Sequence, residues 1–163
     1  QVARLDAERD ADLVCGRVER CGDAAGIWPR RPLPARPSLR TLLASNFVPT
    51  STVLSRRAAV ERAGGFDESF PVAEDYDLWI RIALRAPVLA DPAVVALYRV
   101  DAARAARQHG AEIDALEAIV SRASASGVPA AWLRPARRRI HRHRARHAPD
   151  FRTALAAWRR AIF

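Results

Sequence analysis

The first hundred residues alternate between short apolar runs and turn-forming residues, a pattern typical of a mixed α/β fold. A β-branched run of period two at 11–18 predicts a strand after a short charged helix at 2–10. A second apolar run, 51–56, predicts a buried strand leading directly into a helix at 57–63. The pair Gly64-Gly65 is expected to end that helix in a left-handed conformation.

Proline and serine mark the connections between these elements. Four prolines within 28–37 predict an extended loop, and Ser38 is placed to cap a short helix at 39–44. After a further helix from about Glu74 to Arg85, the runs 87–91 and 94–100 predict two short strands divided by a proline turn.

From residue 101 onward the apolar spacing becomes helical. Apolar residues within 113–123 and 151–162 recur at the spacing of one helix face, with breaks at 127–129 and at Pro149. The pattern therefore predicts an α/β part over 1–100 and an all-helical extension over 101–163.

The length of 163 residues is enough for one domain with a substantial core. The chain begins at Gln1 and contains no Met, so we expect the natural start upstream and the chain to be part of a longer protein. No stretch approaches the roughly 18 apolar residues of a membrane span, and 1–12 is too charged for a signal-peptide core. We therefore expect a cytoplasmic protein.

The positive charge is concentrated in one segment. All 27 basic residues are Arg and the net charge is +9, of which residues 134–147 supply seven arginines and no acid. We expect this segment to be a solvated helix or a basic arm outside the core. It would attract an anionic membrane surface transiently; nucleic acid is a poorer candidate because the segment contains no aromatic residue for base stacking.

Two further residue pairs are not expected to form sites. Cys15 and Cys21 fit neither a zinc site nor a disulfide framework, which indicates two free thiols. His143 and His147 are one helical turn apart, but six nearby arginines would repel a cation.

Acidic residues gather at the start of the helix expected from Glu74. On that helix Asp75, Leu78, Trp79 and Ile82 share one apolar face, while Asp77 falls with Glu74 toward the rim. Acids in a first turn are also common simply because they complement the helix dipole. A carboxylate that leads an apolar face is nevertheless well placed to take a proton from a hydroxyl group.

The order of the motifs around this helix resembles the acceptor-side half of family 2 glycosyltransferases, which are inverting GT-A enzymes with a nucleotide-sugar donor. In that family a strand ending in arginine leads to a helix, a Gly-Gly-Phe-Asp-Glu turn, a Glu-Asp pair that opens a helix with Leu-Trp-x-Arg, and a strand ending in Tyr-Arg. The corresponding segments here are 55–57, 64–68, 74–75, 78–81 and 98–99. The resemblance implies a partial GT-A domain, Rossmann-like and of the nucleotide-diphospho-sugar transferase type, followed by the helical extension.

The resemblance also implies roles for individual residues. Asp75 would be the general base that deprotonates the acceptor hydroxyl. Asp101 stands near the place where the family often has a histidine. Acceptor-binding residues would be Asp67, Glu68, Glu74, Trp79 and Arg81, and Arg99 and Asp101 would lie near the donor or metal. For Arg81 and Arg99 the alternative is an ion pair at the surface or within the domain.

A divalent cation, Mn²⁺ or Mg²⁺, is expected in the complete enzyme. Its Asp-x-Asp ligands and the nucleotide-binding units would lie before Gln1, so the chain alone is expected not to bind donor or to be active. Asp10-Ala11-Asp12 and Asp75-Tyr76-Asp77 spell the same pattern, but neither has the strand-to-loop context of a metal clamp. No metal ligand is therefore assigned within the chain.

The implied partners are a nucleotide-sugar donor and a glycan or lipid-linked acceptor. The resemblance suggests a bacterial enzyme of cell-envelope polysaccharide synthesis, cytoplasmic or peripheral at the inner face of the membrane. The sequence does not predict the sugar, the nucleotide or the acceptor. The alternative hypothesis is a non-catalytic α/β-helical module that binds an anionic partner through 134–147.

Overall fold

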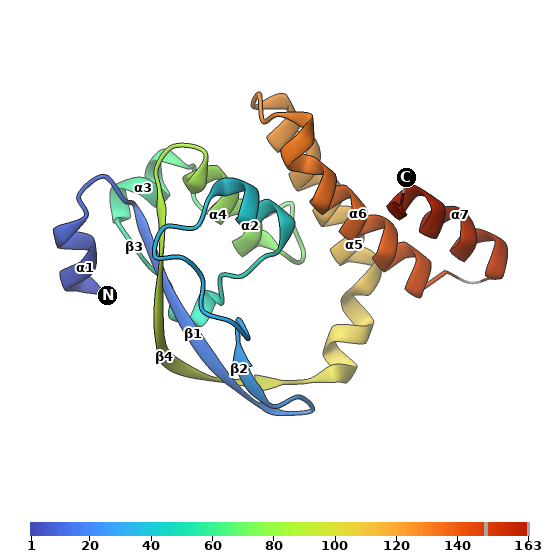
Figure 1. Ribbon diagram of the computed structural model, residues 1–163, viewed down its shortest axis with the longest axis horizontal. Coiled ribbons are helices and arrows are strands. Elements are labelled where there is room, and N and C mark those ends of the chain that lie inside the picture. Colours follow the sequence, from blue (N-terminus) through green and yellow to red (C-terminus); the bar gives the residue numbers. More distant parts are fainter. Residues whose placement is uncertain (149, 163) are drawn as a thin grey trace.

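The computed structural model describes residues 1–148 and 150–162, apart from the side chains of 104–107, 109 and 161–162. Its centre is a four-stranded mixed sheet built on the long strand β1 (Leu13–Gly22) (Figure 1). β2 (Gly26–Trp28) and β3 (Leu54–Ser55) pair antiparallel with one edge of β1. β4 (Val88–Val100) runs parallel to β1 along its other edge.

The helices lie mainly beyond one side of the sheet (Figure 1). α2 and α4 lie between the sheet and the paired helices α5 and α6, and α7 packs against α6 far from the sheet. The helix bounds are α1 Val2–Ala7, α2 Leu39–Ala44, a 3-10 turn η1 Thr50–Thr52, α3 Arg57–Arg62, α4 Glu74–Ala83, α5 Ala102–Ala125, α6 Ala130–Arg146 and α7 Phe151–Ile162.

One hydrophobic core joins the sheet to the C-terminal helices. It includes Leu13 of β1, Leu78 of α4, Ile119 of α5 and Leu133 of α6, each almost fully buried. Burial of apolar surface is the main favourable term in folding, at roughly 25 cal/mol per Å². The predicted class, a mixed α/β part followed by helices, is confirmed.

Several predicted boundaries are confirmed because their signals are local. The Ser38 hydroxyl accepts a hydrogen bond from the Thr41 amide at 3.2 Å and so caps α2. Gly64 and Gly65 follow α3 with φ of +86° and +70°, values that favour glycine. The break at 127–129 also occurs, whereas the break predicted at Pro149 lies outside the described residues.

The two strands predicted at 87–91 and 94–100 are one continuous strand, β4, so the proline turn between them is wrong. Pro92 lies in an irregular part of the ladder, where the pairing with β1 shifts between Cys15 and Arg17, and its missing N–H is tolerated there. Gly16 lies opposite this part, and a Cβ on it would come within 2.6 Å of a Val95 methyl group. Close approach of β4 to β1 therefore requires a glycine at this position.

Two other predictions of strands need correction. The run 51–56 forms the end of η1 and the two-residue β3, because the chain turns at 50–52 before it reaches the sheet. β2 was not predicted, since its three residues are too few for a periodic signal.

The expectation that 134–147 stays outside the core is also wrong. α6 buries Leu133, Ala136 and Ile140, while its arginines are exposed except for the half-buried Arg139. The buried stripe of α6 is narrow and includes an alanine, so its apolar spacing is difficult to recognise in an arginine-rich sequence. Cys15 and Cys21 are both free thiols, as predicted.

Candidate active site

The helix α4 begins at a constrained backbone position. Ala73 precedes it with φ +60° and ψ +20°, a left-handed conformation that costs an L-residue roughly 1–2 kcal/mol. The Ala73 carbonyl nevertheless accepts the Asp77 N–H at 3.0 Å, closing the first turn. Surrounding contacts therefore fix where α4 starts and where the side chains of its first turn point.

Asp75 is half-buried in this first turn. One carboxylate oxygen accepts a hydrogen bond from the Thr50 hydroxyl, and the other accepts one from the Tyr76 N–H at 2.6 Å. Each oxygen of a carboxylate can accept more than one hydrogen bond, so further acceptor capacity is left. The arrangement orients the carboxylate without saturating it.

The support for Asp75 extends to the centre of the sheet. Thr50 opens the η1 turn, and Thr52 at its end is buried. The Thr52 hydroxyl accepts the Gly16 N–H at 3.1 Å and donates to the Pro49 carbonyl at 2.7 Å. The turn that carries Thr50 is thus fixed to the middle of β1.

Tyr76 anchors the same helix turn to α2. Its hydroxyl lies 3.0 Å from the Leu42 carbonyl oxygen and 3.1 Å from that of Leu43. Burial raises the pKa of Tyr76 to about 12, and the Arg139 guanidinium of α6 lies 5.4 Å from its ring centre. Sequence reasoning did not select Tyr76, although an aromatic residue two positions before Leu78 is a signal for burial.

Asp77 occupies a different place from the one expected. It was predicted at the rim, but its side chain is only 2% exposed and lies 2.7 Å from Arg81 and 3.3 Å from Arg122. The prediction assumed that α4 has one buried face, whereas α4 packs against α2 and α3 as well as α5. The alternative interpretation of Arg81, an ion pair within the domain, is confirmed, with Asp77 at i–4 as the partner; nothing in the sequence indicates Arg122.

Arg81 connects α4 to the glycine turn. Its guanidinium donates to the carbonyls of Ala63 and Gly65, the latter at 2.8 Å, as well as to Asp77 at 2.8 Å. These bonds place an expected acceptor-binding residue in a structural network around the turn.

Trp79 is buried, whereas Phe66, whose ring contacts that of Trp79, is exposed to solvent. The two rings meet edge to face with their centres 6.4 Å apart, and Phe66 is 52% exposed. Trp79 lies one turn after Asp75, so Phe66 is held beside the face that Asp75 leads. Sequence reasoning did not select Phe66, although it is the aromatic of the Gly-Gly-Phe-Asp-Glu turn.

The three other acids expected here differ in their surroundings. Asp67 lies 2.6 Å from Arg122 and accepts the Ser69 N–H at 2.9 Å. Hydrogen bonds from Ser69, together with Arg122, lower the pKa of Asp67 to about 2. Glu68 and Glu74 are exposed, Glu74 next to Asp75.

Arg99 and Asp101 lie at another part of the molecule. Arg99 is exposed near the end of β4, opposite Cys21, whereas the η1 turn beside Asp75 contacts Gly16. Five residues of strand separate these two points of β1, or about 16 Å. The structure therefore gathers the expected residues from 67 to 81 and leaves Arg99 and Asp101 apart from them.

The described residues do not fit a divalent-metal site. Within that part of the chain no group of three or more His, Cys, Asp or Glu side chains could hold an ion. Asp10 is ion-paired with Arg36, Asp12 lies 2.8 Å from Arg62, and Asp77 is held by its two arginines.

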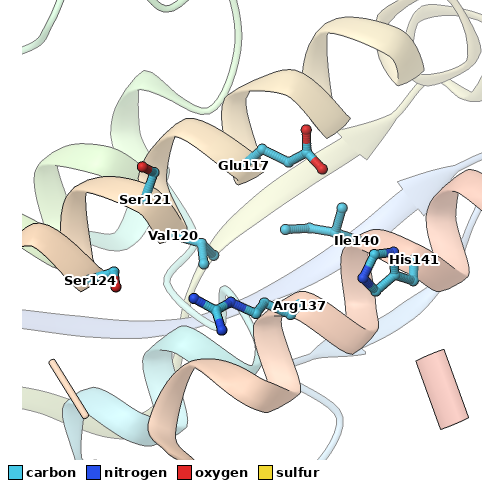
Figure 2. Close-up of a pocket in the computed structure, with 7 residues that line it drawn as sticks. All are labelled: Glu117, Val120, Ser121, Ser124, Arg137, Ile140 and His141. Atoms are coloured by element: carbon cyan, nitrogen blue, oxygen red, sulfur yellow. The ribbon is translucent and has the colours of Figure 1, made fainter. Parts of the chain in front are cut away.

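A separate pocket of about 330 Å³ opens between α5 and α6 (Figure 2). Glu117 and Ser121 reach into it from α5, and Arg137 and His141 from α6. None of the expected site residues lines it. Glu117 is already paired with Arg144 at 2.8 Å.

The expected residues of 67–81 thus surround Asp75. Comparison with known proteins assigns the segment that contains them to a family. A family model described as "Glycosyltransferase like family 2" matches residues 37–127, more than half of the chain and all of the α2–α4 region. No curated protein and no solved structure matches the chain. The chain belongs to glycosyltransferase-like family 2, its mixed sheet and following helices fit a partial GT-A domain, and its family indicates glycosyl transfer as the general activity.

Proposed function

We propose that this chain is the acceptor-side part of an inverting, nucleotide-sugar-dependent glycosyltransferase, with Asp75 as its general base. Family membership supports glycosyl transfer. The observation that carries the assignment is the half-buried Asp75 carboxylate, oriented by the Thr50 hydroxyl on a turn fixed to the sheet. A base held in this way can meet an acceptor hydroxyl at a defined angle.

In the proposed reaction the acceptor hydroxyl oxygen attacks the anomeric carbon of the donor sugar. Its proton passes to the Asp75 carboxylate as the new carbon–oxygen bond forms. The bond from the anomeric carbon to the diphosphate oxygen breaks on the opposite face, and the nucleoside diphosphate leaves with the electron pair. A single displacement of this kind inverts the anomeric configuration.

The acceptor would approach across Phe66. Its half-exposed ring lies beside the α4 face that begins with Asp75, and an aromatic ring can cover the apolar face of a sugar. Glu68 and Glu74 are exposed nearby in sequence and can accept hydrogen bonds from sugar hydroxyls. We propose a glycan or a lipid-linked sugar as the acceptor.

The donor would enter from the side of Gln1. The Gln1 amide donates to the Thr52 carbonyl at 2.7 Å, so residue 1 lies next to the turn that holds Asp75. An Asp-x-Asp loop placed directly before Gln1 would meet the site there. A divalent cation bound there would neutralise charge on the departing diphosphate.

The first test is the substitution Asp75→Asn in the complete protein. It keeps the shape of the side chain but removes the base, so we expect transfer to fall about 10²–10⁴-fold with donor binding little changed. Transfer is measured by release of nucleoside diphosphate, and binding by calorimetry. Asp114→Asn is the matched control, because it makes the same change at an exposed acid of α5 that has no role in the proposed site, and it should change turnover less than two- to three-fold.

Thr50→Val tests the positioning of Asp75 separately. The valine keeps the branched shape but cannot donate a hydrogen bond, so we expect a fall in kcat of about ten-fold with KM nearly unchanged. Near-wild-type turnover of Asp75→Asn would refute the general-base assignment. It would favour the non-catalytic alternative, in which function depends on the arginines of 134–147.

A further inference from the structure

The charge of this protein is divided between its two parts. Residues 130–163 contain ten arginines and one acid, which gives them +9, whereas residues 1–129 contain 17 arginines and 17 acids and have no net charge. The single acid, Asp150, accepts hydrogen bonds from the Thr153 amide at 2.9 Å and the Thr153 hydroxyl at 2.7 Å. The unit formed by α6 and α7, the α6–α7 hairpin, is thus strongly basic.

The same hairpin exposes large apolar side chains. Phe151 is 80% exposed and Trp158 is 52% exposed. Together with Leu155 they lie on one face of α7. With Ala145 and Ala154 they line a groove of about 460 Å³ between α6 and α7. Exposed aromatics next to an apolar groove mark a surface that binds something.

Arginines border this apolar stripe on both sides. Arg142 and Arg146 of α6 line the groove itself and are exposed. Arg152 and Arg159, also exposed, are seven residues apart on α7 and follow the opposite flank of the aromatic stripe. An apolar stripe between two cationic rows is complementary to a surface that is apolar inside and anionic at its polar layer.

We propose that the α6–α7 hairpin docks on an anionic phospholipid bilayer, with Phe151 and Trp158 inserted at the interface and the flanking arginines against the headgroups. Interfacial helices have this combination of a basic polar face and aromatic or aliphatic side chains on the other face. Each basic residue near an anionic leaflet raises the partition coefficient about five-fold. Among the described residues no helix is long and apolar enough to cross a membrane, so the contact would be peripheral.

The groove favours a bilayer over nucleic acid. Its lining is mostly alanine, leucine and aromatic carbon. The phosphate oxygens of a nucleic-acid backbone would find few hydrogen-bond partners against such a surface. α7, which forms the groove with α6, lies at the end of the molecule away from the sheet (Figure 1). The other side of α6 packs against α2 and α5. The proposal does not depend on the proposed catalytic role of Asp75.

The test is flotation of the protein with vesicles of phosphatidylcholine alone and with 30% phosphatidylglycerol. We expect binding to the anionic vesicles at least ten-fold tighter, weakened by 0.5 M NaCl. Arg142→Glu with Arg146→Glu should reduce that binding by more than 50-fold. The matched control is Arg31→Glu with Arg40→Glu, which makes the same change of charge at exposed sites outside the hairpin and should alter binding less than three-fold.

Insertion of the aromatics is tested by quenching with brominated acyl chains. Tryptophan fluorescence of the wild type should be quenched by bound vesicles, and Trp158→Phe should remove most of the quenching, whereas Trp132→Phe should not. Each variant is checked for an unchanged melting temperature. Equal binding to neutral and anionic vesicles, wild-type binding by the charge-reversed hairpin, or binding to DNA or an acidic protein without binding to vesicles would overturn the proposal.

Discussion

At the scale of single residues, the guanidinium of Arg81 joins three parts of the protein. It bonds the buried Asp77 on its own helix and the carbonyls of Ala63 and Gly65 in the glycine turn. Lysine has the charge but not the planar fork, and cannot reach all three acceptors at once. We expect Arg81→Lys to lower the free energy of unfolding by about 1–3 kcal/mol, measured by urea denaturation.

Arg85, one turn further along α4, is the control for this change. Its guanidinium is exposed and, among the described contacts, donates only to the Arg81 carbonyl, so Arg85→Lys should change stability by less than about 0.5 kcal/mol. Equal effects of the two substitutions would show that the network around the glycine turn adds nothing to stability.

Side-chain roles were only partly predictable from the sequence. The helical spacing placed Asp75 correctly at the edge of a buried face, because that inference needs only local geometry. It placed Asp77 at the rim, because no local pattern shows that Arg122, 45 residues away, packs over the other side of α4. Thr50 was missed for the same reason, since its contact with Asp75 spans 25 residues.

At the scale of elements, Asp67 and Arg122 link the loop before α4 to α5. Arg122 pairs with Asp67 at 2.6 Å and lies over the Phe70 ring at 4.8 Å. Bonds from Ser69 and Arg122 lower the pKa of Asp67 from its ordinary value of 3.8 to about 2. Because the folded pKa is the lower one, this contribution to stability is present above about pH 4 and is lost as the pH falls toward 2.

The difference in unfolding free energy between wild type and Asp67→Asn should therefore narrow between pH 4 and pH 2. Urea denaturation at several pH values measures it. Glu68→Gln is the control, since Glu68 is exposed, and its curve should run parallel to that of the wild type. A difference for Asp67→Asn that stays constant down to pH 2 would contradict the proposed link.

Element prediction succeeded where the signal lay within a few residues. The Ser38 cap and the Gly64-Gly65 turn are local devices, and both boundaries were correct. The proline turn predicted at Pro92 was wrong because the cost of a proline in a strand depends on how the neighbouring strand pairs with it. Here Gly16 of β1 allows an irregular ladder opposite Pro92. Likewise, the burial of Ile140 depends on the neighbouring helices and not on α6 itself.

At the scale of the whole molecule, the hydrophobic core crosses the boundary expected at residue 100. Ile119 of α5 is 1% exposed and belongs to the same cluster as Leu13 of β1 and Leu78 of α4. The family match also continues to residue 127, into α5. Parts that share one core and are joined by the Asp67–Arg122 pair are expected to unfold together.

We therefore expect a single cooperative transition that includes both the sheet and helices α5 and α6. Ile119→Ala should lower the unfolding free energy by about 2–4 kcal/mol, because it leaves a cavity in the shared core. Hydrogen exchange should show the same decrease for amides of β1 as for amides of α5. Leu97→Ala, at a position 69% exposed on β4, should leave both sets of amides nearly unchanged. A loss of protection confined to the helices would mean that 101–163 folds as a separate unit, and the core between the two parts would then be a docking interface.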